Sequence, residues 1–339
     1  MKLTLTEVAS FLKRRWILAA VVFLAVVSLG LLFQLVSDPE KPSKKVSLFE
    51  KLEIKAFPTL SKLPPTVDVS SLKTEEAPKK LAVFNLEKEP LFEEDAILLA
   101  KKFGITEKPK SITDVKLGKI FYFFQKPFSL SVQKDQLVFG KSIKPTGELL
   151  ALEQAVKIAQ DFINNKGLEG NLDLDPEDVE YFGSGSPKPL LSSDKNVDII
   201  QISFVKKTEN LPVFGQNPKE SLFYVRIARG GEVVGLKYTF LPKMSVLKDY
   251  PIINSQEATA AIFKGKAVLT YLLAKDDEGM EGFPNYKVTF INLTSAKLAY
   301  LFQLENQTLQ PIYVFWGQAK MDGTKSGDIT FYLPALRGE

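Results

Sequence analysis

An uncharged stretch close to the N-terminus places the strongest constraint on this chain. Residues Trp16 to Val36 form an unbroken run without a charged side chain. At about 1.5 Å per residue, a helix of this length crosses the roughly 30 Å hydrocarbon core of a bilayer. The preceding basic triplet, Lys13 to Arg15, favours a cytoplasmic N-terminus. The sequence therefore predicts a single-pass cell-membrane protein, in which residues 1–37 are a short cytoplasmic tail and a transmembrane anchor and the C-terminal body is extracytoplasmic.

A cleaved signal peptide is the alternative interpretation of the same stretch. The apolar run is longer than the usual hydrophobic region of a signal peptide, and no small-x-small cleavage site follows it. Lys41, Lys44 and Lys45 on the far side reduce the charge difference that would set the orientation. An uncleaved anchor is the preferred interpretation.

Composition excludes several classes of protein. Residues 38–339 are more than one ordinary domain needs and enough to bury sizeable cores. The chain contains no cysteine, which excludes a disulfide-stapled secreted mini-domain. Its net charge of +4 is small for this length, so no electrostatic case exists for binding nucleic acid.

The order of residues predicts a stalk and three folded units. Prolines and lysines are frequent over residues 38–80, which are predicted to form a stalk. Three units follow at 81–145, 146–248 and 249–339, each expected to contain one amphipathic helix and then antiparallel strands. The predicted fold class is therefore α+β, two or three units of a helix packed on an antiparallel sheet behind the transmembrane helix.

The predicted helices follow from apolar residues at helical spacing. The first begins after Pro90 and ends at Gly104, the second follows an N-cap at Thr146, and the third spans Gln256 to Lys264. A hairpin turn is expected at Arg229 to Glu232. Strands are expected at 120–124, 129–133, 136–139, 199–205, 222–228, 233–240, 286–291, 297–304, 312–316 and 329–333.

Few catalytic arrangements are compatible with the residue types present. The chain has no histidine and no cysteine, which removes the commonest general base, thiolate nucleophiles and zinc–thiolate sites. Two Ser-x-x-Lys matches, at Ser192 to Lys195 and Ser131 to Lys134, lie in a predicted loop and at a strand end, where no catalytic dyad is expected. We predict no catalytic, cofactor-binding or metal-binding residues, and that the protein is not an enzyme.

Two further segments contain residue types that are found in binding sites. The acids Asp173, Asp175, Glu177 and Asp178 suggest a calcium loop, but the required glycine and the final bidentate acid are missing, so an exposed turn or a helix start at Pro176 is favoured. The aromatic run Phe121 to Phe124 lacks the glycines and basic residues of an RNA-binding strand. A strand buried on both faces is the preferred interpretation of that run.

One region resembles a known family. A helix containing Glu153 to Ala159, the segment Leu211-Pro212-Val213-Phe214-Gly215, a strand, a glycine turn and another strand resemble PepSY and thermolysin-propeptide domains. The resemblance is strongest over 148–242, weaker over 251–334 and faint over 85–141. Together with the anchor, it makes the chain similar to the YycH/YycI type of extracytoplasmic regulators. The resemblance implies binding to a membrane or envelope protein, such as a sensor kinase or a peptidase, and transfers no catalytic residue.

Three functions are compatible with these observations. The leading hypothesis is a membrane-anchored extracytoplasmic interaction or regulatory module without catalytic activity. A cell-envelope enzyme that acts on glycan through a carboxylate pair is the second, and it requires two carboxylates facing each other across a cleft. The third is a propeptide-like module that restrains a peptidase by strand addition.

Overall fold

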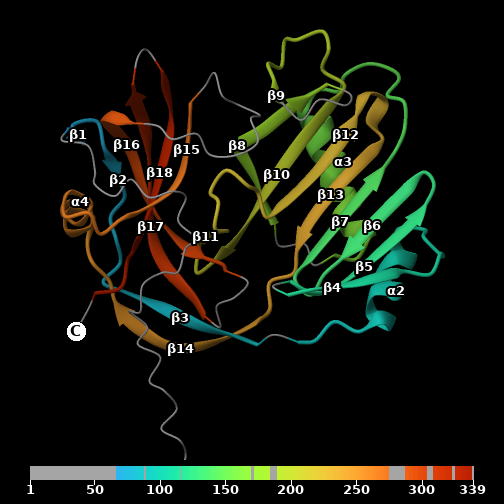
Figure 1. Cartoon of the computed structure of the whole chain (residues 1–339), viewed down its shortest axis with the longest axis horizontal. Coiled ribbons are helices and arrows are strands. Elements are labelled where there is room, and N and C mark those ends of the chain that lie inside the picture. Colours follow the sequence, from blue (N-terminus) through green and yellow to red (C-terminus); the bar gives the residue numbers. More distant parts are fainter. Residues whose placement is uncertain are drawn as a thin grey trace, which may run out of the picture. The chain divides into compact units, whose positions relative to one another are not determined.

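Antiparallel β-strands make up most of the described chain (Figure 1). The computed structural model describes residues 66–87, 89–115, 117–168, 172–183, 189–274, 287–303, 308–322 and 325–337, without the side chains of 174–177. All of them belong to one compact unit, residues 53–339. The predicted span Trp16 to Val36 and residues 38–65 of the predicted stalk lie outside the described residues, whereas residues 66–80 are described and contain short strands. Within the described ranges, no helix is long and apolar enough to cross a membrane.

Nine strands form one antiparallel sheet. Its strands follow the order β4-β5-β6-β7-β13-β12-β10-β8-β9. The strand bounds are β4 (Lys110–Asp114), β5 (Gly118–Gln125), β6 (Phe128–Val132), β7 (Gln136–Lys141), β8 (Leu172–Phe182), β9 (Pro189–Leu190), β10 (Ile199–Thr208), β12 (Phe223–Ala228) and β13 (Val233–Thr239).

Two helices cover one face of this sheet. In α2 (Glu93–Lys102), Ala96 and Ala100 are buried, and in α3 (Leu152–Asn165) the buried residues are Ala155, Ala159 and Ile163. Alanines at i and i+4 lie on one helix face, and their small side chains let the helix backbone approach the sheet closely. Both helices share one hydrophobic core with alternate residues of the strands, among them Phe121, Phe123, Val225 and Ile227.

The turn between β12 and β13 is determined by two glycines. Gly230 and Gly231 have φ values of 78° and 90°, a region that residues with a Cβ seldom adopt. A Cβ on Gly230 would also lie 2.6 Å from the carbonyl oxygen of Thr146. The glycines therefore allow both the tight turn and the close approach of the segment that leads into α3.

The second sheet contains the C-terminal strands in the order β15-β18-β17-β16. Short strands β1, β2 and β11 pair in parallel with the outer edge of β16, while β14 pairs with β3 and β3 with the start of β17. Helix α4 (Ser255–Phe263) precedes β15 and buries Ala258 and Ile262. The strand bounds are β1 (Val67–Asp68), β2 (Lys73–Thr74), β3 (Lys80–Glu87), β11 (Leu211–Phe214), β14 (Lys243–Pro251), β15 (Val268–Ala274), β16 (Val288–Leu301), β17 (Thr308–Met321) and β18 (Ser326–Pro334).

Buried tyrosines connect elements that are far apart in the sequence. The hydroxyl oxygen of Tyr300 lies 2.9 Å from the carbonyl oxygen of Ala82 and 2.9 Å from a carboxylate oxygen of Glu209. The hydroxyl of Tyr332 donates to the carbonyl of Gly215 at 3.0 Å. Because an unsatisfied buried hydroxyl is costly, these hydrogen bonds help to fix the β10–β11 segment against the second sheet.

The predicted α+β fold class is wrong. Strands dominate the described chain, which contains three short α-helices and no described membrane-spanning helix. The fold is mostly sheet rather than a set of PepSY-like units of one helix on one sheet. Residues 81–145 and 146–248 contribute to the same nine-stranded sheet, where β7 pairs with β13, and to the same core. Strand pairing between distant segments leaves little periodic signal in a single sequence, which explains the error.

Several local predictions are confirmed and others are wrong. The three helices and the hairpin turn at Arg229 to Glu232 lie where they were predicted. The N-cap of α3 is Ala151, not Thr146, and the predicted strands 286–291 and 297–304 are parts of one long strand, β16. The described strands that were not predicted are β1, β2, β3, β4, β8, β9, β11, β14 and β15.

Candidate functional site

The face of the nine-stranded sheet that lies opposite α2 and α3 carries polar and aromatic side chains, which are exposed at Phe124 but buried at Gln201, Ser203 and Lys237. We call it the open face. Cross-strand pairing places one residue from each of seven strands in a single row along it: Phe124, Ser129, Gly140, Gly235, Arg226, Gln201 and Glu180. A second row runs beside it, through Tyr122, Ser131, Val138, Lys237, Tyr224 and Ser203.

A groove of about 400 Å³ lies across part of this face. We call it the open-face groove. Tyr122 and Phe124 of β5 form one wall, and Tyr224 and Arg226 of β12 form the other. Small side chains make up its floor between them, namely Ser129, Ser131, Val138, Gly140 and Gly235.

Two glycines keep the floor of the groove low. A Cβ on Gly235 would lie 3.3 Å from Cβ of Arg226, and a Cβ on Gly140 would lie 2.9 Å from Oγ of Ser129. The missing side chains therefore leave room for Arg226 and Ser129 on the neighbouring strands. Neither glycine has a positive φ, so the need is for space and not for a special backbone conformation.

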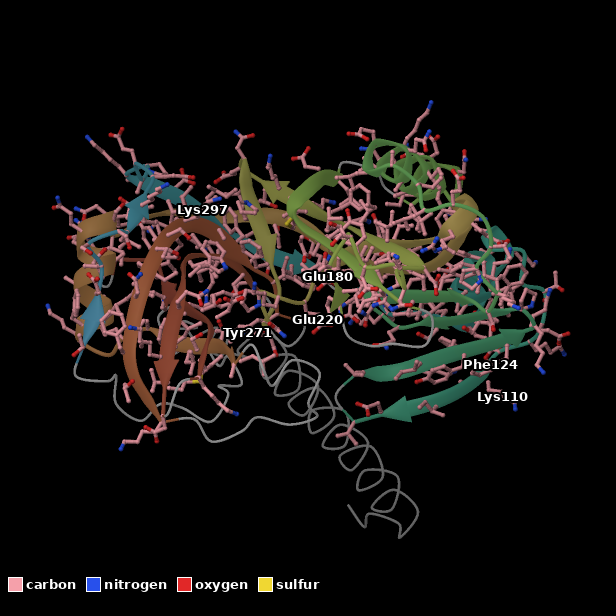
Figure 2. All side chains as sticks on the ribbon, turned by 90° about the horizontal axis from the view of Figure 1, so that it is seen from above. Lys110, Phe124, Glu180, Glu220, Tyr271 and Lys297 are labelled. Carbon is pink, nitrogen blue, oxygen red and sulfur yellow. The ribbon has the colours of Figure 1, made fainter. Side chains whose placement is uncertain are left out.

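The aromatic wall of the groove is unusually exposed. Phe124 is 65% exposed, and its ring stacks on that of Tyr122, with centroids 6.3 Å apart and planes inclined by 10°. Figure 2 shows Phe124 and Lys110 together on the β4–β5 edge, with Glu180 and Glu220 toward the other side of the sheet. An exposed phenylalanine stacked on a half-buried tyrosine beside a hollow is typical of a binding surface.

A chain of polar contacts extends the other wall of the groove. The Nε of Arg226 donates to Oε1 of Gln201 at 2.8 Å, and Nε2 of Gln201 donates to Oε2 of Glu180 at 2.7 Å. The guanidinium lies 5.0 Å from the ring centroid of Tyr224 and 4.9 Å from that of Phe182. Arg226 is thereby held in one orientation by hydrogen bonds and cation–π contacts.

The acidic end of the open face has perturbed carboxylates. Burial raises the pKa of Glu180, and the neighbouring charge of Asp178 raises it further, while Arg226 and Lys219 oppose the shift. Burial likewise raises the pKa of Asp178. Asp178 and Glu180 lie two positions apart on β8, close enough for their charges to interact.

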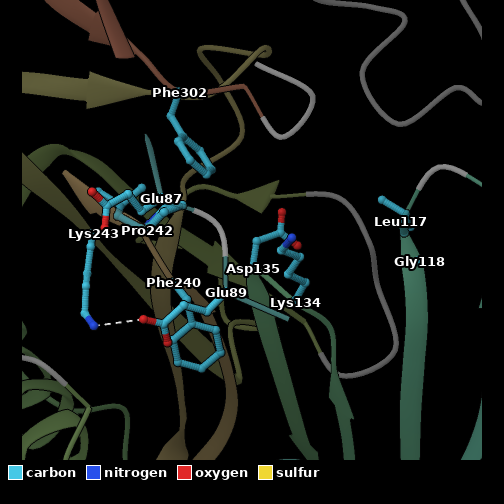
Figure 3. A pocket seen from close by; sticks show the side chains of 11 residues that line it. Glu87, Glu89, Leu117, Gly118, Lys134, Asp135, Phe240, Pro242, Lys243 and Phe302 are labelled. Atoms are coloured by element: carbon cyan, nitrogen blue, oxygen red, sulfur yellow. Dashed lines mark hydrogen bonds and ion pairs between the residues drawn. The ribbon is translucent and has the colours of Figure 1, made fainter. Parts of the chain in front are cut away.

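A second hollow lies where β13 ends and β14 begins (Figure 3). This linker cavity has a volume of about 480 Å³ and is lined by Glu87, Glu89, Leu117, Gly118, Lys134, Asp135, Phe240, Leu241, Pro242, Lys243 and Phe302. At its rim, Nζ of Lys243 forms an ion pair with Oε1 of Glu89 at 2.8 Å. Acidic and basic side chains both line the linker cavity, so its charge does not favour one class of ligand.

The structure confirms some predictions for the residues singled out in the sequence and contradicts others. In the run Phe121 to Phe124, Phe121 and Phe123 are fully buried but Phe124 is exposed, so the prediction of a strand buried on both faces is wrong. Ser192 and Lys195 lie in an exposed turn, and Ser131 and Lys134 lie on β6 and in the turn after it. Val213 of the segment Leu211 to Gly215 is buried in a core cluster.

Metal binding finds no support in the described part of the chain. Asp173 and Asp178 lie on β8. Asp173 forms an ion pair with Lys207, with 2.9 Å between Oδ2 and Nζ. The side chains of Asp175 and Glu177 are not among those that the structure describes. Within the described residues, no group of three or more acids is arranged to hold a metal ion.

Sequence reasoning missed the row of Arg226, Gln201 and Glu180. The available signal was alternation: Gln201 and Ser203 interrupt the apolar residues of β10, and Tyr224 and Arg226 interrupt those of β12. That pattern indicates a polar face on each strand. It does not reveal that the strands are neighbours.

Comparisons with known proteins provide little further information. No protein-family model matches the chain, and no curated protein matches it. A crystal structure of an uncharacterized protein from Eubacterium rectale ATCC 33656 aligns with 10% sequence identity and a TM-score of 0.49, covering 80% of this chain and 88% of that protein.

Proposed function

We propose that this chain is a protein-interaction module that binds an extended segment of a protein partner in the open-face groove and catalyses no reaction. The observation that carries the proposal is the exposed ring of Phe124, stacked on Tyr122 above a floor of small residues. Covering an exposed phenylalanine side chain contributes roughly 1.5 to 3 kcal/mol, and aromatic residues and arginine are enriched in protein interfaces.

The remaining groups of the groove suit an extended peptide. The hydroxyls of Ser129, Ser131, Tyr122 and Tyr224 are able to donate to or accept from peptide groups of a bound segment. Arg226 is already oriented by Gln201 and therefore loses little side-chain entropy when a partner binds. A sensor kinase or a peptidase is the kind of partner expected from the sequence.

The arrangement of carboxylates does not favour the glycan enzyme. A glycosidase holds its two carboxylates on opposite sides of the scissile bond, about 5 to 9.5 Å apart. Asp178 and Glu180 lie two positions apart on one strand, at one end of the open face. Their raised pKa values suit a general acid, but neither residue lines the open-face groove.

Site-specific photo-crosslinking tests the proposal. A benzophenone amino acid replaces Phe124 in the full chain, produced in the cells that naturally make it, and Val246 on β14 is the matched control because its side chain is 62% exposed. We expect a specific protein adduct from position 124 and none from position 246.

A second variant blocks the groove without removing the aromatic wall. Gly140→Val places a side chain on the floor, and its Cβ meets only the movable hydroxyl of Ser129. We expect this variant to fold normally, because valine favours strands, and to lose the adduct from position 124. Equal adducts from both positions, or an adduct unaffected by Gly140→Val, would contradict the proposal.

A further inference from the structure

We propose that two copies of this chain associate edge to edge through β4, as a symmetric antiparallel pair centred on Ile112. The inference concerns the edge of the nine-stranded sheet and does not depend on the function proposed for the open-face groove. It rests on an open and regular strand edge and on a self-complementary sequence.

Within the described residues, β4 offers an edge on which a further strand can pair. It pairs only with β5 there, and all five of its residues are exposed. Its ladder with β5 runs from Lys110 opposite Tyr122 to Asp114 opposite Gly118 without a register shift. The outward N–H and C=O groups of such a strand are a template for another chain.

Other described sheet edges are less suitable for pairing. Strands β14 and β15 each contain an extra residue that breaks their ladders, and such bulges bend a strand and discourage further pairing. Strand β9 has two residues, and the outer edge of β16 is already covered by β1, β2 and β11.

The residues of β4 complement themselves in one register. When two copies pair antiparallel about Ile112, Lys110 of each copy lies opposite Asp114 of the other, Ser111 lies opposite Thr113, and Ile112 lies opposite Ile112. Directly opposed charges of opposite sign stabilise a strand pair, as do opposed hydroxyl and β-branched residues. The backbone amide of Leu117 donates to the Asp114 carboxylate at 2.9 Å, which helps to orient that carboxylate.

The occupant we infer is a second copy, because it matches β4 at every position. An acidic strand from another protein is the competing occupant, since residues 108–126 contain five lysines and a single acid, Asp114. The same lysines repel each other in a dimer, and five residue pairs bury little surface. The association is therefore weak and concentration-dependent.

Disulfide trapping is the principal test, and the absence of native cysteine makes it unambiguous. Opposed residues in an antiparallel pair have Cα atoms about 4.5 to 5.5 Å apart, within the range of a disulfide. We expect the full-length Ile112→Cys variant to form a disulfide-linked dimer under mild oxidation. The side chain of Ile112 is 52% exposed, so this change should not disturb folding.

Two cysteine controls distinguish this register from random collision. In Lys110→Cys the two thiols would be offset by four residues, about 13 Å along the strand, so no efficient crosslink is expected. Val246→Cys places an equally accessible thiol on another edge strand, and it should crosslink only slowly.

A charge swap provides an independent test. In the Ile112→Cys background, Lys110→Glu or Asp114→Lys alone places like charges opposite each other twice, and should weaken dimer formation by about two- to thirtyfold, given the size of two cross-strand charge pairs. The double variant Lys110→Glu with Asp114→Lys restores both pairs and should recover crosslinking.

Several results would overturn the inference. They are an Ile112→Cys variant that crosslinks no faster than Val246→Cys, equal crosslinking from Lys110→Cys, and a double charge swap that fails to rescue. A full chain whose β4 edge binds a different protein or another segment of the same chain would give the first of these results.

Discussion

The rings of Tyr122 and Phe124 are stacked 6.3 Å apart on the open face of the nine-stranded sheet. Their sequence neighbours Phe121 and Phe123 are fully buried on the other face, under α2 and α3. Four consecutive aromatic residues are thus divided between a core and an exposed surface by the two-residue period of the strand. The same residue type therefore packs in the core at one position and is exposed on the surface at another.

The first prediction separates these two roles. Phe121→Ala should lower the free energy of unfolding by about 3 to 5 kcal/mol, because it leaves a cavity in the core. Phe124→Ala should change it by no more than about 0.5 kcal/mol, because that ring is largely exposed. Urea denaturation of both variants measures the difference. Similar losses from the two would show that the ring of Phe124 is buried in solution.

The second prediction concerns the close approach at the β12–β13 turn. Gly230→Ala should lower the free energy of unfolding by about 1 to 3 kcal/mol, because the residue has φ +78° and its Cβ would meet the carbonyl of Thr146. Gly118→Ala is the matched control: φ is +75°, but no atom lies within 4 Å of its Cβ. It should cost only the backbone strain, about 1 kcal/mol. Equal losses in thermal or urea unfolding would exclude a role for the contact with Thr146.

The third prediction tests the buried hydroxyl of Tyr300. Tyr300→Phe leaves the ring in place but removes the hydrogen-bonding partner of the Ala82 carbonyl and of the Glu209 carboxylate. We expect a loss of about 1 to 3 kcal/mol in the free energy of unfolding, because the buried carbonyl of Ala82 loses its hydrogen-bond donor. Chemical denaturation measures it. A variant as stable as the wild type would mean that water replaces the hydroxyl.

The fourth prediction is a pH dependence that originates at Glu180. Burial raises the pKa of this carboxyl above its ordinary value of 4.5, so the folded protein holds the proton at pH values where the unfolded chain has lost it. Stability must therefore fall as pH rises above about 4.5 and through the folded pKa. Glu180→Gln removes this titration and keeps an acceptor for Gln201. The wild type should lose stability relative to the variant as pH rises above about 4.5.

An exposed carboxylate with the opposite shift is the control for this experiment. The hydrogen bond from Lys243 lowers the pKa of Glu89, so its contribution to stability is present above its ordinary pKa and is lost as pH falls. Glu89→Gln should therefore show a dependence of opposite sign, made small by solvent. Unfolding curves measured across this pH range check both variants. The same sign for both would contradict the assignment to Glu180.

Local features of the fold were predictable because they depend on neighbouring residues. The alanines of α2 and α3 recur at helical spacing, and the Gly230-Gly231 pair marks a tight turn by its conformational freedom alone. Helix α4 begins with a capping box in which Asn254 and Glu257 exchange hydrogen bonds. These interactions span three or four residues, a range over which the sequence pattern is informative.

The open-face groove was not predictable for a different reason. Its walls come from β5 and β12, about a hundred positions apart, and they become neighbours only through the pairing of β7 with β13. A single sequence carries no record of that pairing, because alternation identifies the two faces of a strand but not its partners. The α+β prediction failed for the same reason, since strands such as β3 and β14 are defined mainly by pairing with each other.

The sequence by itself determined where the helices and tight turns form, which chemistries the missing histidine and cysteine exclude, and where an uncharged run precedes the body. Only the tertiary structure decided which face of Phe121 to Phe124 is exposed, and that Arg226, Gln201 and Glu180 form one row. The physical reason is the range of the interactions. Backbone conformation and helical spacing act within a few residues, whereas strand pairing and burial join residues that the chain itself holds far apart.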